Sequence, residues 1–160
     1  PWLVARRNQS MVIAPGERET YEVSVSFKQI AEEAAHILRM PLEQVQAIEL
    51  NSANVHMHSF GAAGKTSLLS HHGKKETLLS IPRWDLNWQR DFLFTKPKLI
   101  TTEQFDRSRL TVECTFENYT NEPVYGGFGS DDEMCFNFSY ISIIKEPAGG
   151  DSQSKVAAGR

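Results

Sequence analysis

The sequence lacks both a long hydrophobic run and a cluster of basic residues. A membrane-spanning helix needs about 20 consecutive apolar residues, and no apolar run in this 160-residue chain comes near that length. The 17 lysines and arginines are interspersed with 20 acidic residues, which gives a formal net charge of −3. A basic surface for nucleic acid is therefore not expected, and neither is a membrane span.

Cysteine is also scarce, since Cys114 and Cys135 are the only two in the chain. If they pair, the bridge closes a loop of about twenty residues and stabilises the fold by about 3 kcal/mol on a chain-entropy estimate. A disulfide would also indicate an oxidising compartment. The alternative is two buried thiols in a cytosolic protein, and the residues alone leave both interpretations open.

Alternating apolar and polar residues predict several short strands. The clearest alternation lies in residues 21–27 and 110–116, where every second side chain would face a core. Residues 92–94 also read as extended, with Lys96-Pro97 expected to break the strand, and a last strand is expected at residues 136–144.

One segment has the periodicity of a helix instead. Between residues 28 and 39 apolar side chains recur at helical spacing, and Pro41 follows as a stop signal. Short strands with one inserted helix predict an all-β fold, an antiparallel, jelly-roll-like β-sandwich over residues 1–146. Residues 147–160 have the composition of a disordered tail or linker. The chain starts at Pro1 without a methionine, so a leader or an upstream domain could have been removed.

Two histidines in one extended stretch suggest a metal site. Side chains alternate between the faces of a strand, so His56 and His58 should project from one side, roughly 6–7 Å apart at the backbone. Two imidazoles in this arrangement can hold one metal ion, whereas the alternative is a surface pair without metal. The neighbouring pair His71-His72 is expected in a solvated hairpin turn.

Glycines at 126, 127 and 129 could indicate a phosphate-binding loop. No helix with Lys and Ser/Thr is expected after them, so that interpretation fails its structural context.

Taken together, these motifs resemble one known family. Their order and spacing are similar to those of the catalytic, C-terminal copper domain of the copper type II ascorbate-dependent monooxygenases, which include dopamine β-monooxygenase and peptidylglycine α-hydroxylating monooxygenase. The resemblance runs from about Met11 to about Ile144, and residues 84–89 look like the bacterial branch. The motifs that carry it are His56-Met57-His58, Cys114, Gly126-Gly127-Phe128-Gly129 and Glu133-Met134-Cys135.

The resemblance implies one copper ion held by His56, His58 and Met134. Imidazole suits both copper oxidation states, and a thioether favours Cu(I). Three protein ligands leave a position open for O₂. The implied activity is oxidoreductase chemistry, the hydroxylation of a C–H bond in a small organic substrate by O₂, with ascorbate or another reductant.

Further residue roles follow from the same resemblance. Cys114 and Cys135 match the family's disulfide, which implies a secreted or periplasmic protein. Gln89 corresponds to a polar residue near the copper that holds a water.

The chain also departs from the family pattern. Family enzymes carry a second, electron-transferring copper in a separate N-terminal domain, for which 160 residues leave no room, so a further domain or donor protein is expected. Peptide-hydroxylating members hold the substrate carboxylate with an arginine, an asparagine and a tyrosine. Those positions here are Asn54, Phe136 and Phe138, which favour a less polar substrate than a peptide ending in glycine.

Two other classes of function remain open at this point. One is a secreted copper-binding or interaction module without catalysis, and the other is a structural sandwich whose histidines hold no metal. Copper stoichiometry separates the structural sandwich from the others, and hydroxylation with an electron donor separates the enzyme from the non-catalytic module.

Overall fold

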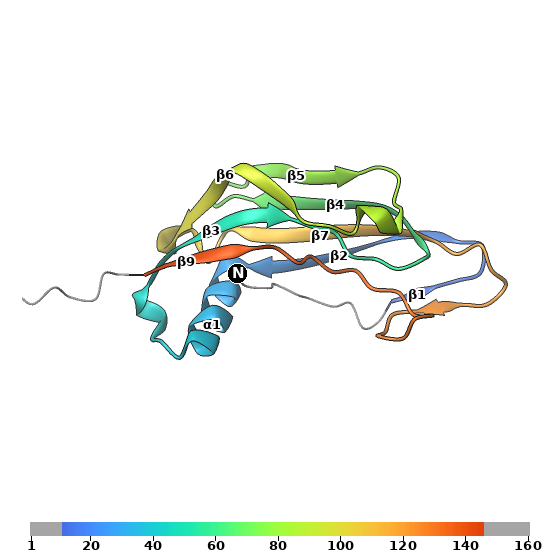
Figure 1. Cartoon of the computed structure of the whole chain (residues 1–160), viewed down its shortest axis with the longest axis horizontal. Coiled ribbons are helices and arrows are strands. Elements are labelled where there is room, and N and C mark those ends of the chain that lie inside the picture. Colours follow the sequence, from blue (N-terminus) through green and yellow to red (C-terminus); the bar gives the residue numbers. More distant parts are fainter. Residues whose placement is uncertain (1–10, 146–160) are drawn as a thin grey trace, which may run out of the picture.

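The computed structural model describes residues 11–145, which form two antiparallel sheets packed face to face (Figure 1). The expected all-β sandwich is thus confirmed. The larger sheet contains, in spatial order, β2 (Arg18–Ser26), β7 (Arg109–Glu117), β4 (Gly61–Leu69) and β5 (Lys75–Ile81). The smaller sheet contains β6 (Phe92–Thr101), β3 (Val45–Ala53) and β9 (Ile141–Lys145).

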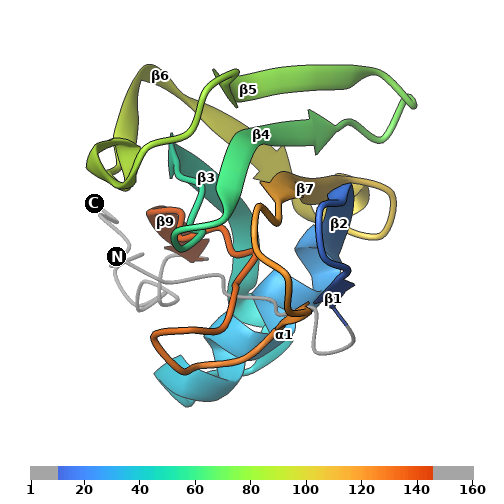
Figure 2. The same cartoon turned by 90° about the vertical axis from the view of Figure 1, so that its right-hand side faces the viewer.

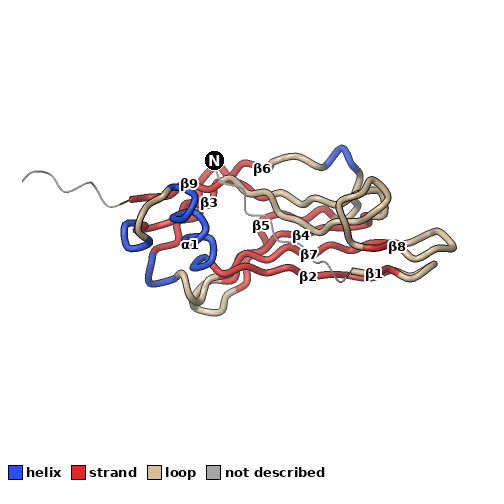
Figure 3. The backbone as a smooth tube through the Cα atoms, turned by 90° about the horizontal axis from the view of Figure 1, so that it is seen from below, coloured by secondary structure: helices blue, strands red, loops and turns tan. Residues whose placement is uncertain are grey.

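The remaining elements lie at the two ends of the sandwich. Helix α1 lies at one end, and a two-stranded ribbon of β1 and β8 lies toward the other, as Figure 3 shows from below. None of the described helices is long and apolar enough to cross a membrane. The bounds are β1 (Val12–Ile13), α1 (Phe27–Leu38), η1 (Leu42–Gln44), η2 (Leu86–Trp88), η3 (Thr102–Gln104) and β8 (Val124–Tyr125).

Helix α1 agrees with its prediction to within one residue at each end. It begins with a capping box, in which the Ser26 hydroxyl accepts from the Gln29 amide at 3.2 Å and the Gln29 side chain accepts from the Ser26 amide at 3.2 Å. It ends at Leu38, and the C-cap residue Arg39 has a left-handed backbone with φ 53°. Its apolar face, with Ile30 and Ala34 buried, covers the end of the sandwich.

The buried side chains form two groups, one between the two sheets and one between the larger sheet and the segments that follow β3 and β8. Figure 2 shows the sandwich end-on. The first lies beside α1, and the second lies under the segment that follows β3. The first includes Val25, Phe27, Ile30, Ala31, Val45, Ile48, Leu50, Ile100, Phe105, Leu110 and Ile141. The second includes Met11, Ile13, Val55, Met57, Ile81, Trp84, Val112, Cys114, Phe116, Val124 and Cys135.

The prediction that Lys96-Pro97 would end a strand is wrong, because β6 continues to Thr101. β6 is an edge strand of the smaller sheet, where proline is tolerated. Its pairing with β3 is also irregular, since Leu50 pairs with Lys98 whereas Ser52 pairs with Leu93. Pro97 therefore lies next to a break in the hydrogen-bond ladder.

The predicted strand at residues 136–144 is also wrong in its first half, because β9 begins only at Ile141. Polar side chains take over the backbone hydrogen bonds there. The Tyr140 amide donates to Ser52 Oγ at 2.8 Å, and the Asn137 side chain donates to the Asn54 carbonyl at 2.6 Å. The predicted tail at residues 147–160 lies outside the described residues.

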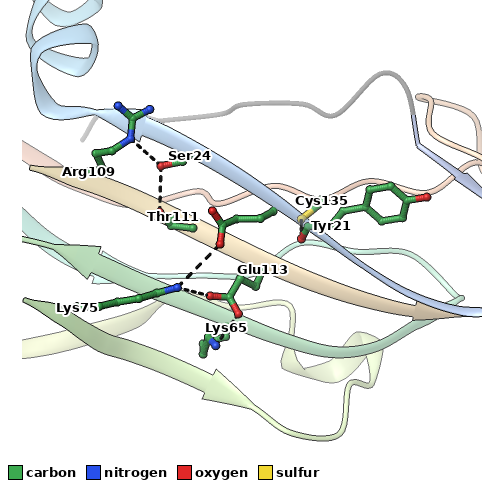
Figure 4. A network of polar contacts seen from close by, with 9 residues as sticks. Tyr21, Ser24, Lys65, Lys75, Arg109, Thr111, Glu113 and Cys135 are labelled. Carbon is green, nitrogen blue, oxygen red and sulfur yellow. Dashed lines mark hydrogen bonds and ion pairs between the residues drawn. The ribbon is translucent and has the colours of Figure 1, made fainter. Parts of the chain in front are cut away.

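A network of charged and hydroxyl groups runs across β2, β7, β4 and β5 (Figure 4). The Glu113 carboxylate lies 2.5 Å from Lys65 Nζ and 2.7 Å from Lys75 Nζ. Burial acts to raise the pKa of Glu113, but its hydrogen bonds and charge interactions with the two lysines hold that pKa below its ordinary value. These partly exposed pairs contribute little stability, and they give this part of the larger sheet a polar surface.

The two cysteines form a disulfide, as the family resemblance implied. Cys114 lies on β7, and its Cα is 5.7 Å from that of Cys135, which directly follows Met134. The bond joins the larger sheet to the segment between β8 and β9.

Removing this bond should destabilise the protein by about 3 kcal/mol on the chain-entropy estimate, because the two cysteines are separated by 21 residues. The test is urea unfolding of the native chain with and without a reductant, with the double variant Cys114→Ala, Cys135→Ala as the permanently unlinked form. An unchanged unfolding midpoint after reduction would contradict this expectation.

Candidate metal centre

The two histidines project from the segment that follows β3, at the end of the sandwich away from α1 (Figure 1). Val55 precedes His56, and Met57 lies between the two histidines; both are completely buried in the second core group. Because side chains alternate along an extended chain, this burial turns His56 and His58 to the opposite side. Their ring centroids are 5.2 Å apart, as the sequence pattern predicted for a pair on one face.

His56 is held by a backbone bridge and two aromatic rings. Its amide donates to the Phe136 carbonyl at 2.9 Å, and its carbonyl accepts from the Phe136 amide at 3.1 Å. The Phe136 ring stacks on the imidazole at 6.0 Å and the Phe138 ring meets it edge-on at 5.2 Å. Burial, and to a smaller extent the charge of His58, lowers the pKa of His56, which favours the neutral imidazole that a metal ion requires.

One ring nitrogen of His58 is already engaged. Its Nδ1 lies 2.7 Å from the Asp132 carbonyl oxygen, and because a carbonyl can only accept, Nδ1 carries the proton. The lone pair of Nε2 is then the one left for a metal. The His58 carbonyl also accepts a hydrogen bond from the Trp84 indole at 3.3 Å.

Met134 lies on the segment that faces the histidines. His56 and Phe136 form an antiparallel bridge two residues from Met134, and Glu133 Oε2 accepts hydrogen bonds from the amides of both His58 and Met134. Only 9% of the Met134 surface is exposed. The neighbouring Cys135 is bonded to Cys114 on β7, so the backbone next to Met134 is fixed to the larger sheet.

Glu133, to which the sequence analysis gave no role beyond membership of the Glu133-Met134-Cys135 motif, lies next to the histidine pair. Its carboxylate is buried and accepts hydrogen bonds from the amides of Phe60 at 2.6 Å, His58 at 2.8 Å and Met134 at 3.3 Å. Burial raises the pKa of Glu133, while these backbone donors act in the opposite direction. Its place in the Glu133-Met134-Cys135 motif was the signal in the sequence.

The glycines before Met134 make room for an acidic side chain rather than for a phosphate. Asp132 Oδ2 accepts a hydrogen bond from the Gly129 amide at 2.8 Å. A Cβ added at Gly127 would lie 2.0 Å from the same oxygen. A side chain at position 127 would therefore displace the Asp132 side chain, and the carbonyl of Asp132 holds His58.

Asn54, predicted to line a substrate pocket, is 5% exposed and lies two residues before His56. Its side-chain amide donates to Asp91 at 3.4 Å, while its Oδ1 has no hydrogen-bond partner among the described residues. Phe136 and Phe138, predicted to belong to the same pocket, contact His56. Gln89 lies at the exposed end of η2, two residues before Asp91, so its role near the metal stays a prediction.

The donor atoms fit copper better than a hard or purely carboxylate-bound metal. Within residues 11–145, no three His, Cys, Asp or Glu side chains gather as a metal site. The predicted set has two imidazoles and a thioether, and only its two histidines belong to those residue types. Imidazole with a soft sulfur ligand is a combination that suits copper.

Replacing Gly127 by alanine should lower the free energy of unfolding by about 1–3 kcal/mol, the usual range for overpacking, because the methyl group meets Asp132. Gly129→Ala is the matched control, since its added Cβ would lie 3.0 Å from the same oxygen. The double variant Gly127→Ala, Asp132→Ala should recover part of the loss. Equal losses for the two glycine variants in denaturant unfolding would refute the steric explanation.

Comparison with known proteins gave a family match. The sequence profile of the C-terminal domain of the copper type II ascorbate-dependent monooxygenases matches residues 3–146. A search of curated proteins found no match.

Proposed function

The chain belongs to the copper type II ascorbate-dependent monooxygenase family, to whose C-terminal domain it corresponds, and from this premise we propose that it binds one copper ion through His56, His58 and Met134. The observation that carries the proposal is the histidine pair, held on one side with ring centroids 5.2 Å apart. The His56–Phe136 bridge and the Glu133 carboxylate, which accepts from the amides of His58 and Met134, support Met134 as the third ligand.

The protein would act as the hydroxylating part of a monooxygenase. Copper bound by these residues would supply the redox chemistry that activates O₂ for insertion into a substrate C–H bond. The residues of the chain hold and shield the site. The Asp132 carbonyl orients the His58 ring, and the rings of Phe136 and Phe138 limit the access of water to His56.

The residues around His56 favour a substrate with an apolar body. Phe136 and Phe138 pack against each other edge-on at 5.7 Å and against His56, and they offer aromatic surface without charge. Asn54 stands where peptide-hydroxylating relatives have an arginine, so a substrate carboxylate would find no cation at that position.

Electrons would come from a partner. The proposal includes ascorbate or another reductant, delivered through an electron-transfer domain or donor protein. The disulfide supports a secreted or periplasmic location, where such a bond persists.

Copper binding tests the ligand set. The native chain should bind one Cu(I), His56→Ala should nearly abolish binding, and Met134→Ile should weaken it at least tenfold because a soft ligand is lost. His71→Ala, in the exposed turn between β4 and β5, is the matched control and should bind like the native chain. Competition with a Cu(I) chelator under reducing conditions measures each affinity. Binding that is indifferent to His56→Ala and Met134→Ile would rule out this site.

Turnover separates the enzyme from a non-catalytic copper module. With copper, O₂ and ascorbate or a chemical electron donor, the protein should hydroxylate arylalkanes in preference to N-acylglycines, because Phe136 and Phe138 offer aromatic rings and Asn54 offers no charge to a carboxylate. Phe138→Ala should raise the KM for an arylalkane about tenfold, which corresponds to about 1.4 kcal/mol of lost apolar contact, and should change Cu(I) affinity much less. Tight copper binding without hydroxylation of any probe would favour the non-catalytic module.

A further inference from the structure

We propose that Glu133 is a positioning residue that sets the place of the Met134 thioether relative to His58. The inference rests on the proposed copper site and assigns to a buried carboxylate a role in the preference of that site for Cu(I). Glu133 does not act as a ligand in this proposal. It acts through the backbone of two segments that each carry one.

The geometry of the carboxylate shows how it joins these segments. Oε2 accepts from the His58 amide at 2.8 Å and from the Met134 amide at 3.3 Å, and Oε1 accepts from the Phe60 amide at 2.6 Å. The side chain is 1% exposed. One anionic group thus receives donors from the segment after β3 and from the segment after β8.

The rest of the site shows why this tie matters for Met134 in particular. His56 is fixed by its own backbone bridge with Phe136. On the far side of Met134, the disulfide fixes Cys135 to β7. Glu133, the residue before Met134, is fixed by its hydrogen bonds to the amides of His58 and Phe60. The residues on both sides of Met134 are therefore held in place. Loosening Glu133 should therefore move Met134 relative to His58 while leaving His56 in place.

The role requires a carboxylate of this length. A glutamine has the same shape but only one acceptor oxygen. Its NH₂ group, which is a donor, would face a backbone amide that is also a donor. An aspartate keeps the charge but is one methylene shorter, so it cannot reach both segments from the same backbone position. Both substitutions should loosen the tie, for different reasons.

Because a thioether favours Cu(I) over Cu(II), Glu133→Gln should lower Cu(I) affinity at least tenfold and Cu(II) affinity much less. It should also weaken the copper–sulfur signal in X-ray absorption spectra of the Cu(I) form. Glu122→Gln, at an exposed glutamate in the loop before β8, is the matched control and should change neither. Glu133→Asp should shift affinity in the same direction and serves as the second variant if Glu133→Gln folds poorly.

A double-mutant cycle separates positioning from general destabilisation. If Glu133 acts through Met134, then Glu133→Gln should cause little further loss of Cu(I) affinity in a Met134→Ile background. Additive losses in the two backgrounds would overturn the inference, because a merely structural role would weaken binding whether or not the methionine is present.

A measurement without copper keeps this inference distinct from the proposed function. In the metal-free native chain the amides of His58, Phe60 and Met134 should exchange slowly with deuterium, and in Glu133→Gln all three should exchange at least tenfold faster while His56 stays protected. Failure of the native chain to bind copper would refute the proposed function. Unchanged exchange of these three amides in Glu133→Gln would overturn the role of Glu133, whatever the copper result.

Discussion

The site depends on the burial of Val55 and Met57, the two apolar side chains that alternate with the histidines. Both are fully buried in the core group that also contains Trp84 and the disulfide. Burying a side chain of this size contributes about 1.5–3 kcal/mol, so a slip of one residue, which would expose both and bury the imidazoles, is strongly disfavoured. The core thereby fixes the direction of His56 and His58 before any metal is present.

The third proposed ligand has a different origin, because Met134 lies in a segment without regular strand pairing. Its place is set by long-range ties on both sides, the Cys114–Cys135 bond and the Glu133 carboxylate. The turn that leads to it contains Gly127, which leaves room for Asp132, and the Asp132 carbonyl orients the His58 ring. Histidine orientation is thus a product of core packing, and methionine position is a product of covalent and polar links.

The periodicity of apolar residues predicted the elements whose structure depends on neighbouring residues in the sequence. Alternation identified β2, β7 and the histidine pair, and helical spacing identified α1 to within one residue. The errors at Pro97 and at residues 136–140 arose where tertiary context decides, through an edge-strand irregularity and through side chains that replace the ladder. Glu133 was visible in the sequence as part of the Glu133-Met134-Cys135 motif, but its hydrogen-bonding role could not be predicted, because its three donors come from amides that only the fold brings together. The disulfide followed from the family resemblance, since two cysteines alone left the free thiols possible.

The most direct test of the central claim is X-ray absorption spectroscopy of the Cu(I)-loaded protein, which reports the atoms bound to the metal. The account predicts two imidazole nitrogens and one sulfur, with the sulfur contribution absent in Met134→Ile and the nitrogen contribution changed in His56→Ala. A spectrum with nitrogen and oxygen neighbours only, or one that is identical in the native chain and Met134→Ile, would contradict the two-histidine, one-methionine site.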